Sequence, residues 1–144
     1  MEVSVANSNH IEYISASLSN YFSTANKYFR HPKYKDDYDL MLKHVSKRIS
    51  DPEGGFLYFV AQEDGDPVGF VNILIGENNF GSILVVIGES REVKKALLEK
   101  AVSYFKERNA TGIYGEVMEF DKESVELLRD MKMKELMISF VLDI

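Results

Sequence analysis

The succession of strand-like and helix-like segments in the middle of the chain constrains the fold most. Three runs rich in aromatic and β-branched side chains, the composition typical of strands, lie at residues 56–62, 68–75 and 82–87. The first two flank residues 63–67, where Asp64-Gly65 favours a sharp reversal, so they predict a hairpin with a five-residue connection. The third run follows a turn at residues 76–79 and is expected to pair antiparallel with the second.

A long amphipathic helix is expected next, over residues 91–108. Its predicted buried face consists of Val93, Leu97, Ala101, Tyr104 and Phe105. Residues 113–120 predict another strand, which lies parallel to the strand before the helix because the chain returns through a crossover. A short helix at 123–131 and a closing strand at 136–144 follow. The pattern predicts an α+β fold, with a mixed, mostly antiparallel sheet, one parallel β-α-β crossover and helices on both faces.

The N-terminal part of the chain predicts a short strand and two helices. Residues 1–6 alternate in polarity and predict the strand. Asn9 and Glu12 have the spacing of a capping box, which predicts a helix over residues 10–22. A second helix is expected over residues 38–50. Between the helices, residues 23–37 mix aromatic and basic side chains with a proline, and we expect no continuous helix there.

Composition narrows the chemistry. The chain has 144 residues, which fit one domain spanning residues 1–144. It has no cysteine, which excludes thiol catalysis and disulfides, and its three histidines show no metal-ligand spacing, so no metal is expected. The net charge of −6 argues against a nucleic-acid binder. Neither a membrane-length apolar run nor a secretory signal is visible, so we expect a cytoplasmic protein with no membrane partner.

The order of elements resembles that of the GCN5-related N-acetyltransferases. In that family the long helix often contains a small residue, two leucines and an acid, matched here by Ala96-Leu97-Leu98-Glu99. The following strand of the family gives Glu, Val and, four residues after the Val, an Asn, which correspond to Glu116, Val117 and Asp121. The resemblance extends over the whole chain and rests on the order and spacing of these matches.

The resemblance implies that acetyl-CoA is a cosubstrate, held between two parallel strands that splay apart. The pantetheine arm would bond to the backbone edge at Val86 and Ile87. The start of the long helix would hold the diphosphate, because helix N-termini bind anions. The implied cofactor-binding residues are Val86, Ile87, Ser90, Arg91, Glu92, Val93, Lys94, Lys95, Asp121 and Ser124.

The diphosphate loop departs from the family pattern of Arg or Gln, two residues, Gly, one residue, and Gly or Ala. Aligning the strand end places Arg91 at the first position and Lys94 at the first glycine, whereas aligning the helix places Glu89 at the first position. Both alignments cannot hold at once, which implies that the loop is about two residues shorter than in the family, and under either alignment the first glycine is missing. Glu89 and Glu92 would repel a diphosphate that Arg91, Lys94 and Lys95 would attract.

The catalytic positions match the family in part. Glu116 occupies the place of the general base, and Tyr114 shares its face of the predicted strand. The tyrosine that usually protonates the departing thiolate is replaced by Leu128. Tyr114 is then the nearby hydroxyl that the sequence offers as a proton donor, with water as the other source.

The first functional hypothesis is an N-acetyltransferase in which an amine attacks acetyl-CoA directly. The alternative is a catalytically degraded domain of the same fold that acts as a binding or regulatory module. A third reading, nucleic-acid binding, rests only on the basic residues between Lys27 and Lys35. The aromatic and basic residues from Tyr21 to Tyr38 would cover the acceptor site, as a packed cap or as a contact for an acidic or aromatic acceptor. A homodimer is left open.

Overall fold

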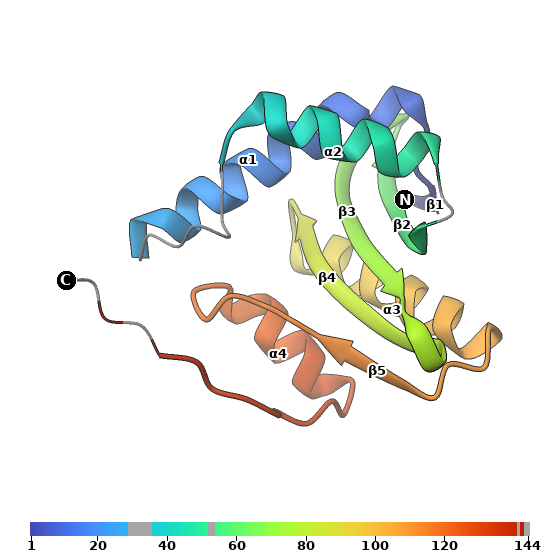
Figure 1. The fold of residues 1–144 in the computed structure, drawn as a ribbon, viewed down its shortest axis with the longest axis vertical. Helices are drawn as coiled ribbons and strands as arrows, with labels where there is room; N and C mark the ends of the chain where they lie inside the picture. The colour runs from blue at the N-terminus through green and yellow to red at the C-terminus, as the bar shows by residue number, and fades with distance from the viewer. Residues whose placement is uncertain (29–35, 52–53, 141, 143–144) are drawn as a thin grey trace.

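The computed structural model of the chain describes residues 1–28, 36–51, 54–140 and 142. Within them, five strands form one sheet in the order β1-β2-β3-β4-β5 (Figure 1). Neighbouring strands from β1 to β4 pair antiparallel to each other, whereas β4 and β5 pair in parallel. The strands are β1 (Glu2–Val5), β2 (Phe56–Glu63), β3 (Asp66–Ile75), β4 (Phe80–Gly88) and β5 (Gly112–Gly115).

Helices cover both faces of the sheet, as the sequence predicted. They are α1 (Ile11–Tyr28), α2 (Tyr38–Ser50), α3 (Arg91–Glu107) and α4 (Lys122–Asp130), with short 3-10 helices η1 (Ser8–His10) and η3 (Glu77–Asn79). On one face, α1 and α2 pack on Tyr58, Val60 and Phe70. On the other, α3 and α4 pack on Phe59, Val71, Ile73, Ile83 and Val86. Alternate residues of the central strands therefore fill two separate cores.

The first helical segment differs from the sequence prediction at both ends. The cap is Asn7 instead of Asn9: its side chain accepts the N–H of Asn9, and His10 completes the capping box. The helix also runs on to Tyr28 instead of ending at residue 22. Ala25 in the added turns is fully buried, and packing of this kind outweighs the weak helix preference of the surrounding polar residues. Residues 29–35, which belong to the predicted basic and aromatic segment, lie outside the described residues.

The β2–β3 hairpin is tighter than predicted. Glu63 pairs with Asp66, so the connection is the two residues Asp64 and Gly65 instead of five. Both have positive φ angles, 51° and 83°, which is the backbone of a type I′ turn. A register shift between Ala61 and Gln62 accommodates Pro67, which has no N–H to donate to a ladder.

A bulge in β4 opens the sheet. Ile73 pairs with Ile83 and Asn72 pairs with Val85, so Leu84 is an extra residue in β4. The pairing of β4 with β5 ends at Ile83 and Gly115, immediately before this bulge. Within the part of the chain that the structure describes, the rest of β4, up to Gly88, therefore has no strand beside it on the β5 side.

Two strand predictions near the C-terminus were wrong: the first strand is shorter than predicted, and the second is not formed in the part that the structure describes. The strand predicted at residues 113–120 ends at Gly115, and the following residues leave the sheet because β4 diverges from them. The closing strand predicted from residue 136 is not formed by residues 136–140, where Leu136, Ile138 and Phe140 are 78%, 73% and 92% exposed. An apolar run becomes a strand only where another strand offers its backbone groups, and this segment extends away from the sheet (Figure 1).

Candidate active site

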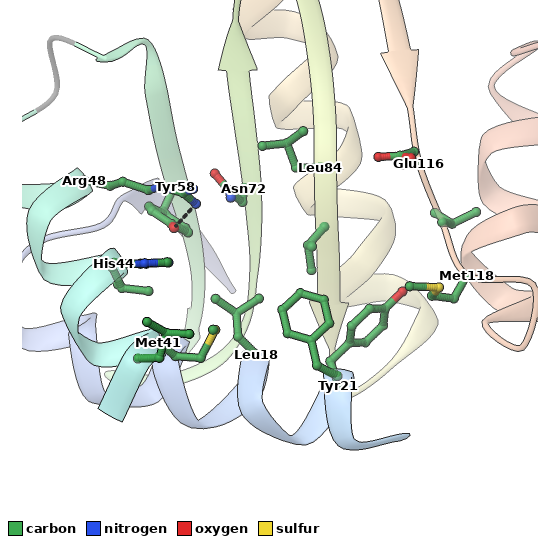
Figure 2. A pocket seen from close by; sticks show the side chains of 15 residues that line it. Leu18, Tyr21, Met41, His44, Arg48, Tyr58, Asn72, Leu84, Glu116 and Met118 are labelled. Atoms are coloured by element: carbon green, nitrogen blue, oxygen red, sulfur yellow. Dashed lines mark hydrogen bonds between the residues drawn. The ribbon is translucent and has the colours of Figure 1, made fainter. Parts of the chain in front are cut away.

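A cavity of about 650 Å³ lies between the α1–α2 layer and the sheet, at the point where β4 and β5 separate. Its size falls in the range of small-molecule sites. Figure 2 shows that α2 forms one wall, strands β3 and β4 form the floor, and the segment after β5 forms the opposite wall. The lining residues are Leu18, Tyr21, Phe22, Leu40, Met41, His44, Val45, Arg48, Tyr58, Asn72, Leu84, Val85, Glu116, Val117 and Met118.

The floor of the cavity is a row of side chains that crosses the sheet. Tyr58 on β2 pairs with Asn72 on β3, and Asn72 pairs with Val85 on β4. Paired residues point to the same face of a sheet, so all three face α1 and α2. The extra residue Leu84 brings a further side chain to this floor beside the opening.

Glu116 stands on the β5 wall. Its backbone N–H donates to the carbonyl oxygen of Ile83 at 3.1 Å, which anchors it to β4 just beyond the last strand pair. Its side chain lines the cavity and is exposed. Tyr114, the second residue predicted to act in catalysis, is half-buried on β5 and does not line the cavity.

Two other tyrosines line the cavity, and the sequence prediction named neither for catalysis. Tyr21 of α1 contacts Phe120 with ring centroids 5.7 Å apart, a contact that joins α1 to the segment after β5. Its hydroxyl points toward Met118, on the β5 side (Figure 2). Tyr58 lies on the β2 side, where its hydroxyl accepts a hydrogen bond from Arg48 Nη1 at 3.3 Å.

Arg48 places a positive charge on the α2 wall. Its guanidinium carbon lies 4.0 Å from the ring centre of Phe56, and none of the ion pairs among the described residues includes Arg48 or Glu116. Burial raises the pKa of Tyr58, although the hydrogen bond and charge of Arg48 act in the opposite direction. The Tyr58 hydroxyl is therefore protonated at neutral pH and retains its proton for donation to a bound molecule.

Asn72 is the polar residue of the floor. It is only 4% exposed, and its Oδ1 has no hydrogen-bond partner among the described residues. Leaving a buried amide oxygen unpaired costs about 1–3 kcal/mol. Asn72 itself lines the cavity, so this unsatisfied oxygen lies just beneath the floor.

The predicted pantetheine edge lies on the unpaired part of β4. Val86 is 3% exposed and packs in the α3 core, whereas Ile87 packs toward α1 and α2, so their side chains are engaged and the backbone between them is at the opening. Beyond them, Glu89 and Ser90 alone separate β4 from α3. This short turn needs Gly88, because a Cβ there would lie 2.9 Å from Val93 Cγ1 and 3.2 Å from the Lys94 backbone nitrogen.

The first turn of α3 holds the other predicted diphosphate residues. Ser90 is the N-cap and accepts the N–H of Val93 at 3.3 Å. The backbone N–H groups of Arg91 and Glu92 have no acceptor within the part of the chain that the structure describes. Glu92 and Lys95 are exposed, and Lys95 lies 3.9 Å from Glu99.

The cationic side chains of that turn point toward α4. Arg91 forms ion pairs with Glu126 at 3.3 Å and Asp130 at 2.9 Å. Lys94, only 15% exposed at its side chain, pairs with Asp121 at 3.3 Å and Glu123 at 3.0 Å. Their charges are thus already balanced by carboxylates of this chain.

Asp121 and Ser124 lie together at the start of α4. Asp121 caps the helix by accepting the N–H of Ser124 at 3.3 Å, and it accepts the Ser124 hydroxyl at 2.6 Å. Leu128 of the same helix, the replacement for the family's tyrosine, is 9% exposed in the α3–α4 core. A Cβ on Gly115 would lie 3.5 Å from Leu128 Cδ1, so this side chain faces the end of β5.

No group of three or more histidine, aspartate or glutamate side chains among the described residues is placed to hold a metal ion. No described helix combines the length and the apolar character needed to cross a membrane.

The sheet that opens between β4 and β5, with a long helix starting at the opening, is matched by known proteins. The model of the Acetyltransferase (GNAT) family matches residues 18–133. This chain belongs to that family. No curated protein matches the sequence significantly.

Solved structures share the GNAT fold. The structure of a probable acetyltransferase matches with a TM-score of 0.77 and 13% identity over 100% of this chain and 98% of that one. A GCN5-related N-acetyltransferase from Ralstonia eutropha matches with a TM-score of 0.75 and 16% identity over 98% and 97%. An aminoglycoside N-acetyltransferase in complex with CoA matches with a TM-score of 0.74 and 13% identity over 99% and 93%. Identities this low establish the fold alone.

The structure brings Glu116 of the predicted site to the cavity, together with three residues that the sequence did not indicate. Those residues are Arg48, Tyr58 and Asn72. Asn72 could have been noticed, because it is the one polar side chain within the apolar run 68–75. The positions of Arg48 and Tyr58 depend on how α2 lies over β2, which periodicity does not specify.

Proposed function

We propose that residues 1–144 act as one acetyltransferase domain that transfers an acetyl group from acetyl-CoA to an amine by direct attack. One observation carries the proposal: the cavity opens where β4 and β5 separate, and Glu116 stands on its wall. An acceptor in this cavity would meet a thioester held along β4. Membership of the GNAT family supports acyl transfer from CoA.

The residues present fit a CoA thioester in two respects. The unpaired edge of β4 at Val86 and Ile87 offers backbone groups to the pantetheine amides. The free N–H groups of Arg91 and Glu92 at the start of α3 offer donors to the diphosphate. When bound, acetyl-CoA supplies an activated acetyl carbon and a thiolate leaving group.

The side chains of the cavity account for the proton transfers. Glu116 takes a proton from the acceptor ammonium group, which leaves the amine free to form the new C–N bond. As the C–S bond breaks, the thiolate needs a proton, and no acid is present at Leu128. We assign this donation to the Tyr21 hydroxyl, since it points toward the β5 side of the cavity, whereas Tyr58 lies on β2, at the far side. The nitrogen that has formed the C–N bond then gives up its second proton, which restores the Tyr21 hydroxyl. Tyr114, the donor suggested by the sequence, remains the alternative.

The second candidate function is a binding or regulatory module that has lost catalysis. Leu128 favours it, as do the ion pairs that occupy Arg91 and Lys94. Nucleic-acid binding, which rests on the basic residues between Lys27 and Lys35, stays a prediction, because only Lys27 among them lies within the described residues.

Isothermal titration calorimetry with acetyl-CoA and with CoA tests the proposal first. We expect binding of both, followed by release of CoA thiol when an amine panel is added. Absence of heat and of any thermal shift at millimolar acetyl-CoA would remove the enzyme reading. Binding of acetyl-CoA without thiol release over the whole panel would favour the regulatory module.

A further inference from the structure

The two walls of the cavity carry opposite charges that are not paired with each other or with the rest of the described chain. Arg48 provides the positive charge on the α2 wall, with His44 one helical turn before it at the rim. Glu116 provides the negative charge on the β5 wall. A ligand that satisfies both walls must carry a cationic group at one end and an anionic group at the other.

The sheet fixes how far apart these ends are. Tyr58, beside Arg48, lies on β2, and Glu116 follows β5, so three strand spacings separate them. Neighbouring strands lie about 4.8 Å apart, which gives roughly 14 Å between the two backbones. Arg48 and Glu116 both extend into the cavity and shorten this gap (Figure 2). Because the Arg48 guanidinium lies at the hydroxyl of Tyr58, a residue of β2, the gap to Glu116 stays wider than the distance between the amine and the carboxylate of an α-amino acid, which are separated by a single carbon.

The floor between the walls offers one more recognition point. Asn72 Oδ1 is buried and unpaired, and it lies one strand from Tyr58 and one strand from Val85. A rotation of the Asn72 amide, whose terminal torsion is soft, would bring this oxygen to the cavity, where an N–H of a ligand lying across the sheet would satisfy it. Around it, Leu18, Met41, Val45 and Leu84 provide an apolar channel that suits a methylene chain.

We propose that the acceptor of this site is an elongated amine that carries a carboxylate at its far end, such as a straight-chain ω-amino carboxylate. The carboxylate binds Arg48 and accepts a hydrogen bond from the Tyr58 hydroxyl. The amine lies between Asn72 and Glu116, next to the opening of the sheet. This proposal rests on the proposed acetyltransferase function. It opposes a polycationic acceptor, because Arg48 would repel a second ammonium group.

Wild-type protein tests the class of acceptor without any substitution. The initial rate of CoA thiol release is measured with straight-chain amino carboxylates from glycine to aminooctanoate, with hexylamine, and with diaminohexane. We expect kcat/KM for aminohexanoate or aminooctanoate to exceed that for hexylamine by about tenfold or more, since a charge-assisted hydrogen bond contributes about 1.5–3 kcal/mol. Glycine and diaminohexane should both give a lower kcat/KM than aminohexanoate. Equal values for aminohexanoate and hexylamine would overturn the proposal.

The variant Arg48→Gln tests whether Arg48 causes the preference for aminohexanoate over hexylamine. Lys47→Gln on the same helix is the matched control. Arg48→Gln should reduce the preference for aminohexanoate over hexylamine to about one, while Lys47→Gln, whose side chain is exposed, should leave it unchanged. Circular dichroism and the thermal midpoint verify that both variants are folded. A preference that survives in Arg48→Gln contradicts the role of this residue.

Calorimetry separates this proposal from the acetyltransferase function on which it rests. Aminohexanoate is titrated into wild type and Arg48→Gln in the presence of CoA, so that no reaction can occur. Binding that depends on Arg48, without any acetyl transfer, would support the acceptor class and refute the enzyme. Acetyl transfer to hexylamine and aminohexanoate at equal rates would support the enzyme and refute the acceptor class.

Discussion

The two ends of the opened sheet use their charged side chains in opposite ways. At the start of α3, Arg91 and Lys94 are paired with four carboxylates of the segment 121–130. In the cavity, Arg48 and Glu116 form no ion pair with any described residue. Both ends contain cations that could attract a ligand, but only the cavity end keeps its cation available.

The difference indicates which groups recognise ligands at each end. Paired charges contribute little net attraction to an incoming anion, because the fields of the cation and its carboxylate largely cancel beyond the short distance that separates them. A diphosphate bound at the start of α3, as proposed, would therefore rely on backbone N–H groups and the dipole of α3. An acceptor bound in the cavity, as proposed, could rely on side chains. Substitutions should thus act through side-chain charge in the cavity and through backbone position at the start of α3.

The largest effect is expected for Glu116→Gln. Removing a general base typically slows turnover by about 100-fold or more, and glutamine keeps the shape of the side chain. We expect kcat to fall by that amount while the Kd of acetyl-CoA, measured by calorimetry, stays within about twofold. Glu119→Gln, an exposed glutamate paired with Lys122, is the control. Unchanged kcat in Glu116→Gln would exclude it as the base.

Tyr21→Phe tests the proton donor at the cavity end. Loss of the hydroxyl should lower kcat by about tenfold with little change in the KM of the acceptor, because general acid catalysis acts in the transition state. Tyr114→Phe is the matched comparison. If Tyr114→Phe slows turnover and Tyr21→Phe does not, the donor suggested by the sequence is the correct one.

Gly88→Ala tests the backbone at the diphosphate end. The added Cβ meets Val93 and the Lys94 backbone nitrogen, so α3 must move or the chain must be strained, at a cost of about 1–3 kcal/mol. We expect several-fold weaker binding of CoA, measured by calorimetry, and a lower thermal midpoint. Gly76→Ala is the control, since its Cβ has only the Phe80 carbonyl oxygen at 3.8 Å. CoA binding unchanged in Gly88→Ala would argue against the role of this turn.

Smaller effects on CoA binding are expected from the paired cations. Arg91→Gln and Lys94→Gln should each change the Kd of CoA by less than about threefold, because their charges are directed to α4. Lys94→Gln should also lower the free energy of unfolding by about 1 kcal/mol in a urea titration, since it breaks a mostly buried pair with Asp121. A loss of CoA affinity above tenfold in either variant would contradict the conclusion that the paired cations at the start of α3 contribute little to ligand binding.

The smallest effect concerns the ionisation of Tyr58. Burial raises its pKa above the ordinary 10.0, so the folded state resists deprotonation more than the unfolded chain. The stability that this difference contributes is present below pH 10 and is lost as pH rises through the folded pKa. Burial also raises the pKa of Tyr13, so an absorbance titration should show a late-ionising component from both tyrosines, and Tyr58→Phe should reduce that component. If the late component is unchanged, this pKa is not raised.

Much of the fold could be predicted from the sequence, because local pattern determined it. The runs at 56–62 and 68–75 alternate between two cores, and the apolar stripe of residues 91–108 is buried as predicted. The predictions of secondary structure were wrong where contacts between residues distant in sequence determine whether a helix or a strand forms. Ala25 is buried in turns of α1 that propensity did not favour, and residues 136–140 pair with no strand among the described residues. The sequence predicted the Asp-Gly turn, but not that the strand pairing would continue to Glu63 and Asp66 and leave a connection of two residues.

The candidate site divides in the same way. The sequence by itself indicated the family, the crossover around the long helix, and Glu116, since each depends on the order and spacing of residues along the chain. Only the tertiary structure decided that Arg48, Tyr58 and Asn72 share a cavity with Glu116, and that Arg91 and Lys94 are paired with α4. The reason is physical: a spacing fixes which face of a helix or strand a side chain occupies, whereas its charge partner is set by the packing of elements distant in sequence.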